Sequence, residues 1–485
     1  MNTIGQKLKL IGLVLILAVN QSYGQLTIHE SEKYDADAKS GKYHSKSVSF
    51  SGLKSFELEY RGEIKVNSND TDVTDISAGG YLEISKTTFG SKRAIVIEKK
   101  EGKLVKEYYE GRQRVAFEPD GKNWLAEILP DIVRSSPIAA EDRINRYFNQ
   151  GGVRAVMNEI SRLDGNHVQN VYGKILLSKK DLTKDQLKNS LVELCKEISS
   201  DYYKSSLLKD VADRFIKDKE LSFAYFEAAS RIDSDYYAST IYTGAIKEVE
   251  LTDEILAKIV EASKNIGSDY YHATVLEEAL DMRDLNDYRI SLIIASTDDI
   301  GSDYYQAQVL SKAMKTRGLS DKSFNSIVNA IGNINSDYYM AEVFEEMLNN
   351  KIKGITAKTV AELLDEHMSS DYYKAAVLSN MLKKQELTLE AIKEVANTIS
   401  NMGSSNYACE VIKDGAKNTR YDKAALIELI RACESIDSDY YASEALQSLA
   451  SQVRNSDEDV KSAYRSAAKS ISSDTYYGRT VKAID

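Results

Sequence analysis

The sequence predicts a mainly α-helical protein, a right-handed α-solenoid of about ten helix pairs preceded by a small antiparallel β domain. The chain of 485 residues is 42% hydrophobic with only 3 Pro, too long for one ordinary core and too apolar to be disordered. Polar and apolar residues alternate between Val48 and Phe117, and after residue 137 a tetrapeptide recurs every 34 residues. In chain order we expect a signal peptide (1–24), a flexible segment (25–45), a β domain (46–120), a helical junction (121–137) and the solenoid (138–485).

The first segment has the pattern of a secretory signal peptide. Lys7 and Lys9 precede an apolar run from Leu10 to Val19, and small residues follow near Gly24. The run is about ten residues long, whereas a membrane-spanning helix needs roughly 20. We therefore expect export by a Sec-type signal to the periplasm or the medium, with no transmembrane helix in the mature chain. The alternative is an uncleaved amphipathic anchor.

Short segments with a two-residue period predict the β domain, and turn-forming residues separate them. The five segments are Phe56–Tyr60, Glu63–Val66, Tyr81–Ser85, Ala94–Glu98 and Val115–Phe117. Such a sheet buries one face, and Trp124, Leu125, Ile128 and Leu129 of the junction are spaced to cover it.

One turn of this domain, Asn67 to Asp75, carries oxygen ligands at alternating positions, which invites a calcium interpretation. It lacks the Gly and the distant Glu of an EF-hand loop, so we expect a solvated hairpin loop.

The repeated tetrapeptide is Ser-Asp-Tyr-Tyr, and it begins at Ser200, Ser234, Ser268, Ser302, Ser336, Ser370 and Ser438. A decayed copy, Ser404-Ser-Asn-Tyr407, fills the gap in the series. A variant, Ser473-Asp-Thr-Tyr-Tyr477, stands one residue out of phase, as a terminal repeat often does.

Each 34-residue repeat is predicted to be a helix pair. Apolar residues stand seven, eight, eleven and twelve positions after the motif serine, a spacing that places them in one stripe along a helix. A second helix is expected to begin eighteen positions after the serine, where a side chain can cap the helix N-terminus. These capping residues are Thr252, Asn286, Ser320, Thr388, Asp422 and Ser456. Earlier pairs without the motif are expected over residues 139–163 and 171–198. Because neither helix buries its stripe alone, the pairs must stack.

In period and pattern the array resembles TPR, HEAT and Sel1-type helical repeats, although the Trp, Gly and Pro signature of TPR is missing. The β segment with Gly79-Gly80-Tyr81-Leu-Glu-Ile, joined to such helices, also resembles the extracytoplasmic portion of some BlaR-type signalling proteins. Since His29-Glu30 is followed by Ser-Glu-Lys, the His-Glu-x-x-His motif of a peptidase is absent from the sequence. The resemblance therefore implies sensing or binding.

The serine and the aspartate of the motif can be explained by helix formation alone. Its serine is expected to cap the helix that follows, and its aspartate to favour the positive helix end. Adjacent tyrosines point about 100° apart on a helix, so they cannot fill one slot. We expect the second tyrosine (Tyr271, Tyr305, Tyr339 and Tyr373) to be the more buried. The first tyrosines are the candidate partner-binding residues: Tyr202, Tyr236, Tyr270, Tyr304, Tyr338, Tyr372 and Tyr440.

We expect no enzyme, and no catalytic, cofactor-binding or metal-binding residue. Five His (His29, His44, His167, His272 and His367) lack metal-ligand spacing, and there is no phosphate loop or nucleophile elbow. The motif supplies one Asp per repeat, too far apart for an acid and base pair. Cys195, Cys409 and Cys433 lie at small or apolar helix positions, so they are expected to be buried side chains.

The predicted function is an exported, non-enzymatic scaffold that binds a protein or peptide through its repeat surface, with envelope sensing or signalling as the expected role. Rows of Tyr suit protein partners and also sugars, so a glycan-binding module is the alternative. The second alternative is an enzyme with a site in the β domain or at the junction near Trp124. A net charge of −11 disfavours nucleic acid as a partner.

Overall fold

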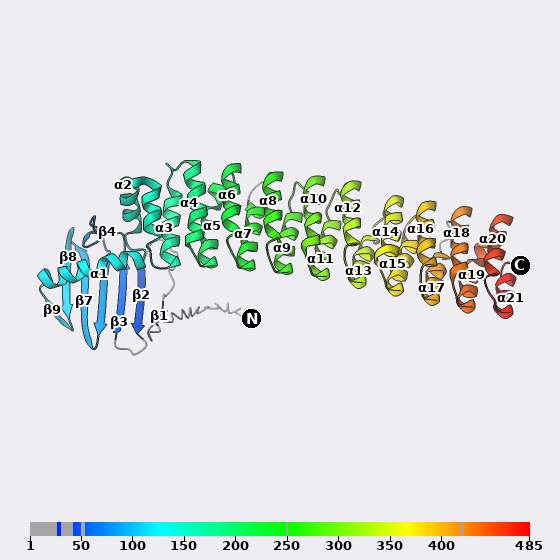
Figure 1. Ribbon diagram of the computed structural model, residues 1–485, viewed down its shortest axis with the longest axis horizontal. Helices are drawn as coiled ribbons and strands as arrows, with labels where there is room; N and C mark the ends of the chain where they lie inside the picture. Colours follow the sequence, from blue (N-terminus) through cyan, green and yellow to red (C-terminus); the bar gives the residue numbers. More distant parts are fainter. Residues whose placement is uncertain (1–26, 31–41, 50–53, 249–250, 418–420) are drawn as a thin grey trace, which may run out of the picture. The chain divides into compact units, whose positions relative to one another are not determined.

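The computed structural model describes residues 27–30, 42–49, 54–248, 251–417 and 421–485. Over these residues the protein is an array of helical repeats preceded by an antiparallel β domain, as the sequence predicts (Figure 1). The chain forms two compact units, residues 1–211 and 212–485, which are described separately. The expected signal peptide lies outside the described residues. Among the helices that are described, none combines the length and the apolar character needed to cross a membrane.

The first unit begins with a seven-stranded antiparallel sheet of order β1-β2-β3-β6-β7-β8-β9. Its strands are β1 (Thr27–Glu30), β2 (Lys42–Ser49), β3 (Lys54–Arg61), β6 (Tyr81–Thr88), β7 (Ser91–Lys100), β8 (Lys103–Glu110) and β9 (Gln113–Val115). A separate hairpin pairs β4 (Ile64–Val66) with β5 (Val73–Ile76). Residues 25–45, which we expected to be flexible, include β1 and the start of β2. The last predicted strand ends at Val115, and Phe117 begins the short turn η1 (Phe117–Gly121).

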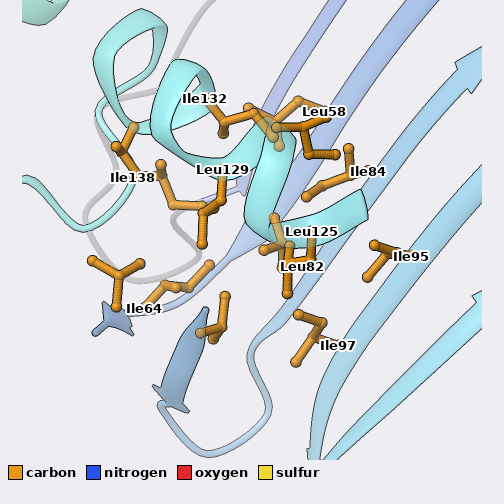
Figure 2. Packing of buried hydrophobic residues seen from close by; sticks show 14 of the residues in the cluster. Leu58, Ile64, Leu82, Ile84, Ile95, Ile97, Leu125, Leu129, Ile132 and Ile138 are labelled. Atoms are coloured by element: carbon orange, nitrogen blue, oxygen red, sulfur yellow. The ribbon is translucent and has the colours of Figure 1, made fainter. Parts of the chain in front are cut away.

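Helix α1 (Lys122–Ser135) covers one face of this sheet, as the spacing of its apolar residues predicts. Leu125, Leu129 and Ile132 point towards Leu82 and other apolar strand residues in Figure 2. Trp124, the single Trp of the chain, lies in the same core, with its ring centroid 6.0 Å from that of Tyr108. The β sheet and α1 therefore share one hydrophobic core.

Three further helices lie wholly in the first unit: α2 (Ala140–Ile160), α3 (Asn166–Ser178) and α4 (Lys184–Glu197). Helix α5 (Asp201–Phe215) begins there. Non-helical backbone at Gly151 and Gly152 breaks α2 in two, and Gly152 has φ +62°, a conformation that glycine adopts without strain. The broken α2 corresponds to the helix pair expected over residues 139–163.

The prediction of a solvated loop between β4 and β5 is wrong, because this loop is held against α2. Asp70 is 7% exposed, and its Oδ2 accepts from Nε and Nη2 of Arg143 at 3.2 and 3.1 Å. Arg146 donates to Oδ1 of Asp70 at 2.6 Å and to the carbonyl of Asn67 at 2.8 Å. The acidic loop is therefore neutralised by arginines 73 and 76 residues further along the chain.

Arg143 is the centre of this buried cluster and is 0% exposed. Its Nη2 also donates to Oε1 of Glu159 at 2.6 Å, and its Nη1 donates to the carbonyl of Val133 at 2.9 Å and to the Tyr172 hydroxyl. Burial opposes the charge of Arg143, but Tyr172, Asp70 and Glu159 outweigh that effect and raise its pKa. Burial raises the pKa of Tyr172 to about 12. The guanidinium thus stays charged and joins the hairpin to α1, α2 and α3.

The second unit consists of two layers of helices (Figure 1). The motif layer contains α7 (Asp235–Glu248), α9 (Asp269–Leu280), α11 (Asp303–Met314), α13 (Asp337–Met347), α15 (Asp371–Lys384), α17 (Ser405–Gly415), α19 (Asp439–Arg454) and α21 (Asp474–Lys482). The other layer contains α6 (Lys219–Ala229), α8 (Asp253–Ser263), α10 (Asp287–Ala295), α12 (Asp321–Ile331), α14 (Gly354–His367), α16 (Leu389–Ser400), α18 (Lys423–Ala432) and α20 (Glu458–Ala468). Each helix contacts the next helix of its own layer, so consecutive repeats stack as predicted.

Side-chain caps begin the helices of the second layer except α14, whose N-cap residue Lys353 makes no capping hydrogen bond. The predicted caps Thr252, Asn286, Ser320, Thr388 and Asp422 each accept a bond from a backbone N–H three residues on, at 2.8 to 3.4 Å. The prediction for Ser456 is wrong, because Asp457 caps α20 instead. The repeat that starts at Ser438 therefore has one extra residue before its second helix. For this reason the last motif, at Ser473, comes one residue later than the 34-residue period predicts.

We predict that Arg143→Met lowers the stability of the first unit by about 3–5 kcal/mol, because it leaves two buried carboxylates without their shared cation. Urea unfolding followed by the fluorescence of Trp124 reports on this unit. Arg162→Met, at an exposed position after α2, is the control and should change stability by less than about 0.5 kcal/mol. Equal losses in the two variants would contradict a structural role for the cluster.

Candidate partner-binding surface

In six repeats the motif aspartate joins its own repeat to the next one. Its carboxylate accepts a hydrogen bond from a backbone N–H just before the next motif helix, 32 to 34 residues further on. The donor and acceptor residues, with their N···O distances, are Gly267 and Asp235 (3.0 Å), Gly301 and Asp269 (3.0 Å), Asn335 and Asp303 (3.0 Å), Ser370 and Asp337 (2.7 Å), Ser404 and Asp371 (2.8 Å), and Ser473 and Asp439 (2.9 Å). We call this bond the aspartate clamp.

The decayed copy of the motif and helix α3, which has no copy of it, make an equivalent bond with another oxygen. In the decayed copy, Ser405 takes the aspartate position, and its Oγ accepts from the N–H of Ser438 at 3.2 Å. In the first unit, Oδ1 of Asn166 accepts from the N–H groups of Ser199 and Ser200 at 2.7 and 3.0 Å. What the position requires is therefore an acceptor oxygen rather than a negative charge.

The motif serine does not cap its helix as predicted. Ser268, Ser302, Ser336, Ser370 and Ser438 stand at the N-cap position, but their side chains make no capping hydrogen bond. Their backbone also differs from that of the second-layer caps: ψ lies between 111° and 116° at these serines and between 160° and 173° at Thr252, Asn286, Ser320, Thr388 and Asp422. In the decayed copy Ser404 does accept from the N–H of Tyr407, at 3.5 Å.

The two tyrosines of each motif differ in exposure, and the prediction that the second is the more buried is confirmed. The first tyrosines are 44–57% exposed, and these are the predicted partner-binding residues Tyr202, Tyr236, Tyr270, Tyr304, Tyr338, Tyr372 and Tyr440. The second tyrosines are only partly exposed. The candidate residues of the second unit thus lie in a row on the motif layer.

The motif tyrosines from Tyr236 to Tyr407 form a continuous series of ring contacts, which we call the tyrosine ladder. Within a motif the ring centroids lie 4.9 to 5.1 Å apart. The first tyrosine also contacts the second tyrosine of the next repeat at 5.7 to 6.0 Å, from Tyr236 and Tyr271 through to Tyr372 and Tyr407. Most of these pairs are edge-to-face, a geometry worth about 0.5–1.5 kcal/mol each beyond area burial.

Asn406 interrupts the ladder, because it takes the place of a first tyrosine. Contact resumes between Tyr440 and Tyr476 at 5.8 Å. In this last motif Tyr476 occupies the second-tyrosine position and Thr475 the first, since Ser473 is the N-cap of α21. The chain therefore accepts Asn and Thr where other repeats have an exposed Tyr.

Open grooves lie between consecutive helices of the motif layer. One of about 500 Å³ lies between α11 and α13, and one of about 280 Å³ lies at the equivalent place between α15 and α17, two repeats further on. Each is lined by a first tyrosine and an alanine of one helix and by the second tyrosine and a glutamate of the next. These residues are Tyr304, Ala307, Tyr339 and Glu342 in the first groove and Tyr372, Ala375, Tyr407 and Glu410 in the second.

Ion pairs connect neighbouring motif helices along these grooves. Lysine Nζ atoms lie 2.7 to 2.8 Å from carboxylate oxygens of the adjacent helix, in the pairs Lys247–Glu278, Lys312–Asp281, Lys315–Glu346 and Lys383–Asp414. Exposed pairs of this kind contribute about 0–1 kcal/mol each. Their main consequence is that lysines of the grooves are already neutralised by the protein's own carboxylates.

The three cysteines are buried and form no disulfide, which confirms that they are small buried side chains. Burial raises the pKa of Cys409 to about 11, so its thiol stays protonated. Among the described residues no group of three or more His, Cys, Asp and Glu is arranged to hold a metal ion. The side chains of His29 and His44 lie outside the described residues.

His272 is a buried packing residue on the motif helix α9. Its Nε2 lies 3.1 Å from Oγ of Ser296, and burial lowers its pKa. Gln306 and Met340 stand at the same motif position in the next two repeats and are also buried. The position thus accepts polar and apolar side chains of similar length.

Comparisons with known proteins assign no family to this chain. No protein-family model matches it, and no curated protein matches it. Among solved structures, one match is to a chain from a study described as "Computational Design of Self-Assembling Cyclic Protein Homooligomers". The identity is 16% and the TM-score 0.13, with 62% of this chain and 88% of that chain covered. A similarity at this level supports no inference about the fold or the function of this chain. No homologue supports the resemblance to BlaR-type proteins.

Removing one aspartate clamp should loosen a single junction between repeats. In Asp337→Ala the N–H groups of Ser369 and Ser370 lose their acceptor, at a cost of about 1–3 kcal/mol. Hydrogen exchange of peptides that contain these amides should accelerate. Asp337→Asn keeps an acceptor oxygen, as Asn166 does, and should exchange nearly as slowly as the unchanged protein. The clamp is refuted if the Asn and Ala variants exchange equally fast.

His272 should make stability depend on pH. Because its pKa in the folded protein lies below the unfolded value of about 6.5, the unfolded chain binds more protons as the pH falls through that region, and stability decreases. His272→Gln, which copies Gln306, should therefore lose less unfolding free energy than the unchanged protein between about pH 8 and pH 5. Urea unfolding at the two pH values checks this, and equal losses would contradict it.

Proposed function

We propose that this chain is an exported, non-enzymatic scaffold that binds a protein or peptide partner through its motif layer, in envelope sensing or signalling. The observation that carries the proposal is the row of exposed first tyrosines beside open grooves. Tyrosine offers a large contact area with few rotatable bonds, so it contributes strongly to protein interfaces. The ladder holds these rings in place before a partner arrives, which reduces the entropy that binding must overcome.

The enzymatic alternative depended on clustered titratable side chains in a pocket near the junction. Such a cluster exists around Arg143, but Arg143, Glu159 and Tyr172 are at most 2% exposed and bond one another. Their arrangement supports a structural role. The motif layer supports binding, since equivalent grooves recur there along the array.

The test is a selection of flexible peptides from a display library with the full chain as bait, followed by titration of the selected peptides. The test variant carries Tyr304→Asn, Tyr338→Asn and Tyr372→Asn, three changes that copy the natural Asn406. If each tyrosine contributes about 1 kcal/mol, the three changes together should weaken binding by roughly 100-fold. Circular dichroism checks that its helix content is unchanged.

The control variant is Tyr288→Asn on α10, since Tyr288 is exposed on the other layer. Its affinity should stay within about twofold of the unchanged protein. Peptide binding that the triple variant leaves intact would refute the proposed surface. A glycan array that finds sugars bound in a tyrosine-dependent way, with no peptide selected, would favour the glycan-binding alternative.

A further inference from the structure

The two grooves of the motif layer are lined by the same types of side chain. In each, the exposed ring of a first tyrosine (Tyr304 or Tyr372) stands beside a small alanine, and an exposed glutamate (Glu342 or Glu410) faces them from the next helix. An aromatic ring with a carboxylate near it is suited to a cationic side chain, which the ring attracts through its electron-rich face. The alanine leaves room for the aliphatic stem of that side chain.

The charges around the first groove favour the same class of ligand. Helices α9 and α13 carry Asp269, Glu277, Glu278, Asp337, Glu342, Glu345 and Glu346, and they contain no Lys or Arg. Lys312, Lys315 and Lys383 are paired with carboxylates. Within the described part of the chain, Glu342 and Glu410 make no ion pair or hydrogen bond of their own. The negative charge left over is therefore available to a partner.

The spacing of the grooves limits how a ligand can reach both. Packed helices lie about 8–10 Å apart, so two repeats separate the grooves by roughly 16–20 Å. An extended peptide advances about 3.3 Å per residue and covers that distance in about five or six residues. Cations must recur at about this interval to occupy both grooves.

We propose that the motif layer binds an extended peptide segment whose Lys or Arg side chains recur about every six residues, with one cation beside Tyr304 and Glu342 and another beside Tyr372 and Glu410. This inference rests on the proposed function, because it names the partner class of the same surface. The acidic surface excludes anionic partners by repulsion, and it gives binding a dependence on salt concentration.

The test uses the full chain and three fluorescent peptides of equal length, titrated by anisotropy at low salt. The first has four Arg at six-residue spacing in a Gly and Ser background. The second has the same composition with its four Arg adjacent, and the third has Glu in place of Arg. The spaced cationic peptide should bind at least about tenfold more tightly than the clustered one, the acidic peptide should not bind, and about 0.5 M salt should abolish the binding.

A pair of double variants tests the site itself. Glu342→Gln with Glu410→Gln removes from each groove the carboxylate that faces the exposed tyrosine, and it should weaken binding of the spaced peptide by about five- to thirtyfold. Glu261→Gln with Glu366→Gln changes net charge equally on α8 and α14 of the other layer, where both carboxylates are well exposed, and should change affinity less than twofold.

Each outcome decides a different question. Equal weakening in both double variants, or equal affinity for spaced and clustered cations, would overturn the assignment of the grooves. If the library yields tyrosine-dependent peptides that lack cations, this inference fails while the proposed function stands. If no peptide of any charge binds in a tyrosine-dependent way, the proposed function fails as well.

Discussion

The aspartate clamp is the interaction on which the repeat array of the second unit depends. A carboxylate in the first turn of one motif helix accepts from the backbone just before the next motif helix, so one bond fixes both where a helix begins and how far it lies from its neighbour. Backbone N–H groups at a helix start have no partner inside the helix, and an acceptor from the preceding repeat supplies one. Since the bond recurs at 32 to 34 residues, it sets the interval at which the motif helices stack. The two tyrosines lie two and three positions after each motif serine, so their rings recur at the same interval and form the ladder.

The features that follow from periodicity could be predicted from the sequence. Helix pairs, the second-layer caps at Thr252 or Thr388, and the different exposure of Tyr338 and Tyr339 all follow from residue spacing within one repeat. Strand β8 was not predicted because Leu104 and Val105 are adjacent, as are Tyr108 and Tyr109, so this segment lacks a two-residue period.

The features that were missed depend on partners far away in the chain or on local hydrogen bonds that composition does not reveal. Asp70 is buried because Arg143 lies 73 residues later, and no local pattern in the loop indicates that contact. The motif serine is a good capping residue by type, yet in five copies its side chain makes no capping hydrogen bond. For the aspartate clamp a signal was present in the sequence: the position after the motif serine holds Asp or, in the decayed copy, Ser, residue types that share an acceptor oxygen, over a fixed period.

Asn406 gives the ladder a finite length. Between Tyr237 and Tyr407 the aromatic row runs for five steps of 34 residues, and at about 10 Å per step its contour is roughly 50 Å. An extended segment laid along it covers about fifteen residues before the rings stop. For the extended partner proposed above, a segment longer than this would gain no further aromatic contact beyond Tyr407 until it had crossed the Asn406 repeat.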